Sequence, residues 1–333
     1  MFRRALVSAT GVGATIALAL SVGSATASSD AAAEKSGSAV STTVSKAAQE
    51  KAKDYWTSSR MKAAKDGSLL VRDRSKVHAG RTVAQGSPVI HQGTAAKAPA
   101  SKPNKAYGGG YYTGGGKVVA TTGKVFFTLG GTDYVCSGSS TTAANQSLVQ
   151  TAGHCLNEGP GSFATKFTFV PAYRDGSAPY GQFAATNLYT SSQWANSGDL
   201  NYDIGYAKVG TSGGRTLTAA VGAQGVGFNL ARGATMYSFG YPAASPYSGQ
   251  RLAWCNGVVA ADTWGGSSDQ GMVCNMTGGS SGGPWFINYS TSSGVGTLNS
   301  LNSFKYNGGP QANRMFGPYF GSVIQGVYNA AQG

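Results

Sequence analysis

Short apolar runs separated by turn residues dominate the chain from residue 117 onward. Residues 124–129 and 132–136 form two such runs, and the Gly130-Gly131 pair between them is a strong signal for a β-hairpin. Similar runs recur at residues 118–120, 167–170, 204–209, 236–240 and 295–298. The pattern predicts an all-β fold, either a sandwich or a barrel. Residues 319–331 carry apolar side chains at helical spacing, which predicts one C-terminal helix.

The composition favours the same fold class and excludes several others. The chain has 333 residues, enough for one large domain or two modest ones. Its 50 glycines are about twice the usual share of ~7%, and its 12% of charged residues is about half of the usual ~25%. Coiled coils and helical bundles need long runs of good helix formers, which are missing here. With 41% hydrophobic residues, the chain also differs from a charge-rich disordered protein.

The first 27 residues have the pattern of a signal peptide. Arg3 and Arg4 precede an apolar stretch, and Ala25-Thr26-Ala27 offers a cleavage site of small residues. A transmembrane anchor is disfavoured because the strongly apolar part, residues 14–20, is short against the ~20 residues that a span needs. We therefore expect export by a general or twin-arginine route and a secreted, extracellular protein. We expect no membrane span after cleavage.

Residues 28–105 differ in texture from the rest and carry most of the charge. Residues 1–105 hold 16 of the 26 Lys and Arg but only 6 of the 13 Asp and Glu. These basic residues are scattered among Ala, Ser and Gly with few aromatic neighbours, which argues against nucleic-acid binding. Residues 45–64 predict one weak helix, and a Pro-, Gly- and Ser-rich linker follows. We interpret 28–105 as a pro-segment and linker, with a disordered spacer as the alternative, and 106–333 as the compact domain.

The four cysteines of an exported chain indicate two disulfides, for which three pairings exist. Sequential pairing, Cys136 with Cys155 and Cys255 with Cys274, closes two loops of equal length. A cysteine metal site is disfavoured because the chain has no Cys-x-x-Cys motif and His154 is the only histidine after residue 91. We expect neither a metal nor another cofactor.

Two short motifs carry residues suited to nucleophilic catalysis. His154 lies in Thr-Ala-Gly-His-Cys, and it is the only candidate in the domain for a proton shuttle near neutral pH. Ser281 lies in Gly-Gly-Ser-Ser-Gly-Gly-Pro-Trp. A serine hydroxyl needs an adjacent base, and glycines let the backbone turn tightly enough to aim N–H groups at a developing oxyanion. Either motif alone is equally consistent with a structural turn.

Together, the two motifs resemble those of the chymotrypsin-like serine peptidases. The similarity covers roughly residue 123 to the C-terminus. Residues 1–105 are called the leader below, and its residues 55–61 resemble a pro-segment of exported bacterial relatives. The resemblance implies two antiparallel six-stranded β-barrels with a site between them, and the pairing of Cys136 with Cys155 beside the histidine. It also implies a secreted serine endopeptidase, monomeric, that acts on protein or peptide substrates.

The resemblance further implies a triad in the chain order His, Asp, Ser. Ser281 would be the nucleophile, His154 the base, and the backbone N–H groups of Gly279 and Ser281 the oxyanion hole. The aspartate must lie between His154 and Ser281. Asp203 matches the family's Asp-Ile-apolar element, and Asp199 is the runner-up. The other candidates are Asp175, Asp262 and Asp269.

The primary pocket, which in this family selects the substrate side chain before the cleaved bond, has two candidate sets of lining residues. In the family, the residue six positions before the nucleophile lines the base of the primary pocket, and here it is Asn275. Residues 298–302, with Ser300 among them, are expected to form the pocket wall. Asn275 carries no charge to pair with Lys or Arg, and no histidine follows His154 to supply the pocket of bacterial glutamyl endopeptidases. These residues predict a neutral, polar pocket.

One departure from the family pattern concerns activation. Animal relatives carry an Asp immediately before the nucleophile, which pairs with a new amino terminus, whereas this chain has Ser280. We therefore expect the loop 278–282 to reach its active shape without a buried amino terminus, with Ser280 donating its hydroxyl to a nearby carbonyl.

Two alternative functions share the same scaffold. A catalytically inactive, protease-like secreted binding domain would keep the disulfides and glycine loops but would not need all three triad members. An esterase or acyltransferase would use the same triad, and a comparison of ester and peptide turnover distinguishes it from a peptidase.

Overall fold

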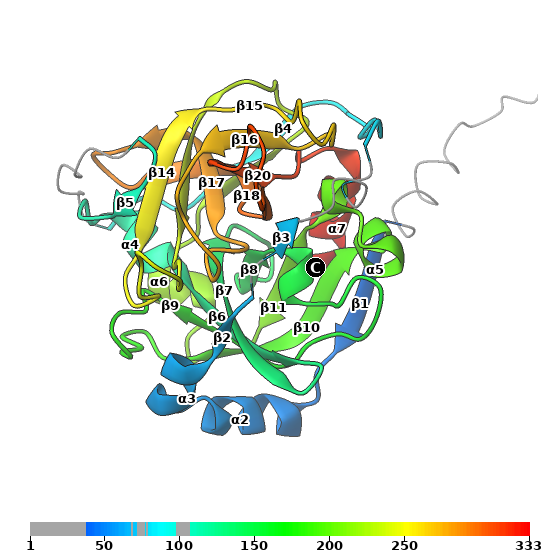
Figure 1. Ribbon diagram of the computed structural model, residues 1–333. Coiled ribbons are helices and arrows are strands. Elements are labelled where there is room, and N and C mark those ends of the chain that lie inside the picture. Colours follow the sequence, from blue (N-terminus) through cyan, green and yellow to red (C-terminus); the bar gives the residue numbers. More distant parts are fainter. Residues whose placement is uncertain (1–37, 68, 72–76, 78, 98–106) are drawn as a thin grey trace, which may run out of the picture.

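The computed structural model describes residues 38–67, 69–71, 77, 79–97 and 107–333. The expected signal peptide, residues 1–27, lies outside these ranges. The described chain is mostly β-structure with a few short helices, which confirms the predicted all-β class (Figure 1). Among the described helices, none is both long enough and apolar enough to cross a bilayer.

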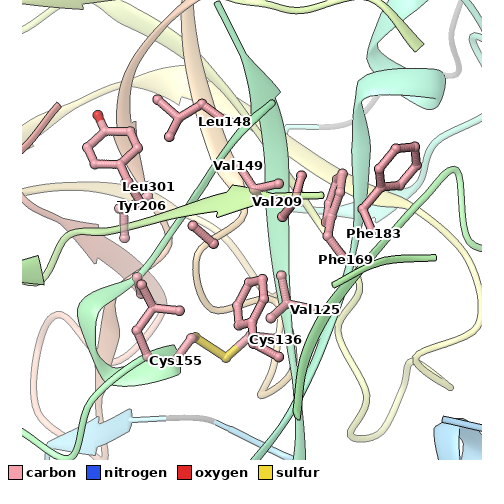
Figure 2. Packing of buried hydrophobic residues seen from close by; sticks show 14 of the residues in the cluster. Val125, Cys136, Leu148, Val149, Cys155, Phe169, Phe183, Tyr206, Val209 and Leu301 are labelled. Atoms are coloured by element: carbon pink, nitrogen blue, oxygen red, sulfur yellow. A yellow bond between two sulfur atoms is a disulfide. The ribbon is translucent and has the colours of Figure 1, made fainter. Parts of the chain in front are cut away.

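The first half of the domain is a closed barrel. Its strands follow the order β10-β11-β8-β7-β6-β9, and β9 pairs back with β10 to close the ring. The bounds are β6 Thr122–Leu129, β7 Thr132–Thr141, β8 Leu148–Thr151, β9 Thr165–Pro171, β10 Phe183–Ser191 and β11 Gly205–Val209. The predicted hairpin at Gly130-Gly131 is confirmed, since Leu129 pairs with Thr132 across it. Figure 2 shows the apolar interior, where Val125, Val149 and Phe169 pack together.

The second half consists of two sheets. The larger has the order β4-β12-β18-β17-β13-β14-β5, and the smaller has the order β15-β16-β20-β19-β3. The bounds are β3 Leu69–Val71, β4 Val89–His91, β5 Gly110–Tyr111, β12 Gly225–Phe228, β13 Thr235–Gly240, β14 Ala253–Val258, β15 Ala260–Ala261, β16 Gln270–Val273, β17 Pro284–Ser290, β18 Val295–Leu301, β19 Phe304–Tyr306 and β20 Arg314–Gly317. The two sheets meet where β14 lies against β16 and β18 against β20. No backbone hydrogen-bond ladder joins β14 to β16 or β18 to β20. The expected second barrel is thus present as two separate hydrogen-bonded sheets that pack against each other.

Short helices flank the two halves. They are α2 Lys46–Tyr55, α3 Ser58–Ala63, α4 Lys117–Thr121, α5 Ser192–Ser197, α6 Leu217–Val221 and α7 Ser322–Ala331, with one-turn 3₁₀ segments η2 Gly153–Cys155 and η3 Leu200–Tyr202. The predicted C-terminal helix is confirmed by α7, which buries Ile324, Val327 and Tyr328. The single helix expected over residues 45–64 is split in two. The break lies at Trp56, and the Thr57 side chain caps α3 by accepting from the N–H of Arg60.

The leader residues 38–91 add strands to both halves. Strands β1 (Ala39–Thr43) and β2 (Lys65–Asp66) pair with β10 and β7 of the barrel, whereas β3 and β4 pair with β19 and β12 of the second half. In Figure 1, the blue helices α2 and α3 lie outside the barrel, and the chain then rises through β2 and β3. Trp56 anchors the helices: it is 1% exposed, its Nε1 donates to the Lys166 carbonyl at 2.7 Å, and its ring lies 5.4 Å from that of Phe126.

A buried amide at Asn302 connects the strands of the second half. Its Oδ1 accepts from Ser238 Oγ at 2.8 Å and from Trp285 Nε1 at 2.7 Å. Its Nδ2 donates to the carbonyls of Phe239 at 3.1 Å and Ser280 at 3.0 Å. The side chain has no exposed surface, so all four bonds lie away from water, where an unpaired polar group is costly. Asn302 thus links β13, β17 and the loop that carries Ser281.

We predict that Asn302→Ala destabilises the protein by about 3 kcal/mol or more, because it leaves the buried donors of Ser238 and Trp285 without their acceptor and removes one hydrogen bond each from the carbonyls of Phe239 and Ser280. Denaturant unfolding of the full chain measures this loss. Asn313→Ala is the control, since Asn313 is exposed and its side chain makes no hydrogen bond to the described residues. Equal midpoints for the two variants would contradict the role given to Asn302.

Candidate active site

His154 and Asp203 meet at one end of the barrel. His154 lies in η2, directly after β8, and Asp203 lies between η3 and β11. The Asp203 carboxylate accepts from His154 twice, from the backbone N–H to Oδ1 and from Nδ1 to Oδ2, both at 2.8 Å. A Cβ added at Gly153 would lie 3.0 Å from Asp203 Oδ1, which explains why glycine precedes the histidine. Because the carboxylate holds the proton on Nδ1, Nε2 carries the free lone pair.

The second half of the domain supplies a third hydrogen bond to Asp203. Ser303 Oγ donates to Asp203 Oδ2 at 2.5 Å. The Asp203 side chain has no exposed surface, and His154 is only 8% exposed. Three donors therefore stabilise one buried negative charge, as a carboxylate in a low-dielectric site requires. Sequence reasoning missed Ser303, since no local motif marks a residue that acts on a carboxylate 100 positions away.

Ser281 lies in a glycine-rich turn that the barrel holds in place. Ser137 of β7 donates its N–H to the Ser281 carbonyl at 2.7 Å and its Oγ to the Gly279 carbonyl at 2.8 Å. Gly279 has φ +88°, and a Cβ there would lie 2.9 Å from the Tyr241 carbonyl. The N–H groups of Gly279 and Ser281 donate to no residue in the described chain. The turn thus leaves two backbone donors available beside the serine.

Ser280 makes the kind of contact expected from the sequence. Its Oγ donates to the Thr277 carbonyl at 2.7 Å, and its N–H points to the same carbonyl at 3.3 Å. The residue is 1% exposed. A neutral hydroxyl therefore occupies the position before Ser281 and closes the turn on itself.

Two neighbouring cavities contain the candidate residues. Ser281 lines a cavity of about 310 Å³, and His154 lines one of about 370 Å³. Asp66 of the leader lines both. His154 Nε2 is buried and has no hydrogen-bond partner among the described residues, so no bond joins it to Ser281 in this state. One leader residue thus borders both the cavity of Ser281 and the cavity of His154.

The two residues expected to form the pocket lie elsewhere. Asn275 is exposed, and its Oδ1 accepts from Tyr247 Oη at 2.6 Å. Ser300 is fully buried, and its Oγ donates to the Pro318 carbonyl at 2.9 Å. Neither lines the cavity beside Ser281. That cavity is formed, apart from the Ser281 turn and Asp66, by Ala244, Met276, Thr277, Ser303, Phe304, Lys305 and Met315.

The other candidate aspartates lie in helix caps, turns or buried positions apart from His154. Asp199 caps η3 by accepting from the Asn201 N–H, and its carboxylate pairs with Arg81 of the leader at 3.2 Å. Asp175 is exposed beside Arg174 and Arg251. Asp262 accepts several hydrogen bonds within its own turn. Burial raises the pKa of Asp269 well above its usual range, and the nearby negative charge of Asp203 is the second-largest cause.

The disulfides follow the sequential pairing. Cys136 is joined to Cys155, and Cys255 to Cys274 (Figure 2 shows the first pair). The first bond ties β7 to η2 and so fixes the residue after His154. The sulfurs of Cys136 and Cys155 lie near a His154 ring nitrogen, within 4.8 Å, which is the spacing of a metal site. Since the two sulfurs are bonded to each other, they are not thiolates and do not suit a metal ion.

Among curated proteins, the chain has a partial match to a bacterial protease. No family model matches the chain. The extracellular metalloprotease of Bacillus subtilis (strain 168) is 36% identical over 84 residues. The match covers 25% of this chain and 26% of that protein, so the chain spans about a quarter of this curated relative.

Solved structures are much more similar. The protease Anisep from Arthrobacter nicotinovorans is 50% identical, with 70% of this chain and 98% of that chain covered and a TM-score of 0.61. The thermostable serine protease AL20 from an extremophilic microorganism is 47% identical, with 65% and 98% covered and the same TM-score. A Glu endopeptidase at 19% identity and a TM-score of 0.52 shares the fold, with 68% and 97% covered. With half of its aligned residues identical to a solved protease over nearly that whole chain, this protein belongs to the chymotrypsin-like serine proteases.

Proposed function

We propose that this protein is a secreted serine endopeptidase that hydrolyses peptide bonds through an acyl-enzyme on Ser281. The observation that carries the proposal is the geometry of His154, whose Nδ1 is held by the buried Asp203 while Nε2 faces away without a partner. In that tautomer, Nε2 is a base ready to accept a proton. Ser281 lies on the neighbouring cavity, in a turn rich in glycine.

The proposed reaction has two halves. Ser281 Oγ attacks the carbonyl carbon while His154 Nε2 takes the hydroxyl proton, and the same nitrogen then delivers that proton to the leaving amine. Water attacks the resulting ester, His154 again takes a proton, and Ser281 leaves with it. Asp203 stabilises the imidazolium formed in each half. The free N–H groups of Gly279 and Ser281 stabilise the oxyanion.

The leader acts in this proposal as a pro-segment that covers the cleft. Asp66 pairs with Val135 of β7 on the histidine side, and residues 69–71 pair with β19 on the serine side. Asp66 lines both cavities. The bond between Ser281 Oγ and His154 Nε2 forms once this segment has left. Residues 1–27 are the export signal, and the two disulfides suit an extracellular protein.

Single substitutions test the triad. Ser281→Ala and His154→Ala are each expected to lower kcat by about 10⁶-fold, with little further loss in the double variant, because the two side chains act as a unit. Asp203→Ala is expected to cost about 10⁴-fold. Asp199→Ala is the matched control, since that carboxylate caps η3. Greater loss from Asp199→Ala than from Asp203→Ala would refute the assignment.

Stoichiometric labelling of Ser281 by an organophosphonate separates a working enzyme from an inactive binding domain.

The leader contact gives a second test. Trp56→Ala removes the buried anchor of α2 and α3, so the unprocessed chain is expected to react with an organophosphonate at least about tenfold faster at Ser281, as the covered state loses population. The measurement is the labelling rate of purified full-length chain. Lys51→Ala, an exposed change on α2, is the control. An unchanged rate for Trp56→Ala would mean that the leader does not cover the site.

Ser280 leads to a third prediction. Because its hydroxyl already closes the turn on the Thr277 carbonyl, the active loop needs no buried amino terminus. Extra residues ahead of the natural start of the processed enzyme should therefore change kcat on a small chromogenic substrate by less than about tenfold. A hundredfold loss that trimming restores would show that the new amine has a partner within the domain.

A further inference from the structure

The cavity beside Ser281 contains one basic side chain that the proposed chemistry does not use. Lys305 of β19 lines this cavity, two residues after Ser303, which holds Asp203. Its Nζ donates to the Cys274 carbonyl at 2.7 Å. The disulfide to Cys255 and the bond from the Cys274 N–H to the Asn313 carbonyl hold that carbonyl in place. The ammonium therefore has a defined position in the cavity.

The ammonium of Lys305 lacks a counter-ion. An ammonium has three donors, and the Cys274 carbonyl uses one of them. Within the described residues, no carboxylate lies within ion-pair distance of Lys305. The side chain is half-buried, and burial lowers the pKa of its amine, which is the cost of a charge without a partner. An anion that entered the cavity would relieve this cost.

The rest of the cavity lining favours an ion pair between Lys305 and an entering anion over solvation of the ammonium by water. Met276 and Met315 contribute thioether and methylene surface, and Thr277 contributes a small polar side chain whose hydroxyl already donates to the Ala244 carbonyl. Opposite charges attract more strongly beside apolar surface than in water. The one acidic residue among those described around this cavity is Asp66, which belongs to the leader. When the leader departs, the described lining keeps its cation and loses its carboxylate.

We propose that this cavity binds an acidic side chain of the substrate, next to the scissile bond, and that Lys305 is the residue that selects it. This inference rests on the proposed peptidase function. The selection differs from the neutral, polar pocket expected from the sequence, because Lys305 and the two methionines replace Asn275 and Ser300 as the lining. The methionines give the carboxylate an apolar collar, and the Lys305 ammonium gives it a charge partner.

Three peptide nitroanilides that differ only in the residue before the cleaved bond test this proposal. Glu and Gln have the same shape and differ in charge, and Leu reports on the apolar walls. For the active enzyme obtained from the full chain, kcat/KM for Glu is expected to exceed that for Gln at least about tenfold, the size of a charge-assisted hydrogen bond. Lys305→Met keeps the length of the side chain and should bring the Glu to Gln ratio to about 1, with Leu cleaved as well as before or better. Lys208→Met is the matched control: this lysine is also half-buried, and its amine donates to the Gly333 carbonyl, so the variant should keep the wild-type ratio.

The outcomes separate this proposal from the one on which it rests. Organophosphonate labelling of Ser281 and casein cleavage establish the peptidase in each variant, and they also show that Lys305→Met folds. A wild-type enzyme that is labelled but cleaves Leu in preference to Glu overturns the selection of acidic side chains. A Lys305→Met enzyme that keeps its Glu to Gln ratio overturns the role of Lys305. A chain that neither reacts with the phosphonate nor cleaves any peptide overturns the proposed function itself.

Discussion

A carboxylate buried without exposed surface is stable in a protein only where hydrogen bonds replace the water it has lost. Asp203 is such a group, and its three donors come from His154 of the barrel and Ser303 of the second half. Removing any one of them leaves a buried charge less compensated, so the two halves are constrained to meet at this point. The imidazole is thereby fixed in one tautomer and one orientation before any substrate arrives.

The serine turn depends on the same boundary between the halves. Ser137 of the barrel holds two of its carbonyls, and Asn302 of the second half holds that of Ser280. These contacts are buried, and each polar atom involved is paired. A turn held from both sides keeps the N–H groups of Gly279 and Ser281 free and in place. Backbone donors fixed in advance stabilise developing charge without reorganising during the reaction.

In the described structure, one segment of the leader lies against strands on both sides of the candidate site. The leader adds strands to β7 and β19, and Asp66 lies at both cavities. Strand pairing of this kind uses main-chain hydrogen bonds and makes few demands on side chains. The elements that bind the leader are the ones that flank Ser281 and His154.

Local patterns along the chain were enough to predict the fold class, the hairpin at Gly130-Gly131 and the C-terminal helix, and to single out the two motifs around His154 and Ser281. These are local properties, set by apolar periodicity and by the need for glycine at tight turns. The resemblance to the chymotrypsin-like peptidases favoured Asp203 as the aspartate, because this residue heads the Asp-Ile-apolar element, with Asp199 as the runner-up.

Which side chains surround Ser281 depends on how distant segments of the chain pack together. Asn275 and Met276 are neighbours in the chain, but Asn275 is exposed while Met276 is buried and lines the cavity. Successive residues of an extended chain point to opposite faces, so the local backbone direction decides which of these two neighbours borders the cavity. Ser303 and Lys305 contact residues 100 and 31 positions away. The first contact requires the two halves to pack together, and the second requires β19 to lie beside the segment after β16 within the second half. The split of the leader helix at Trp56 has the same cause, since that side chain is buried against the barrel.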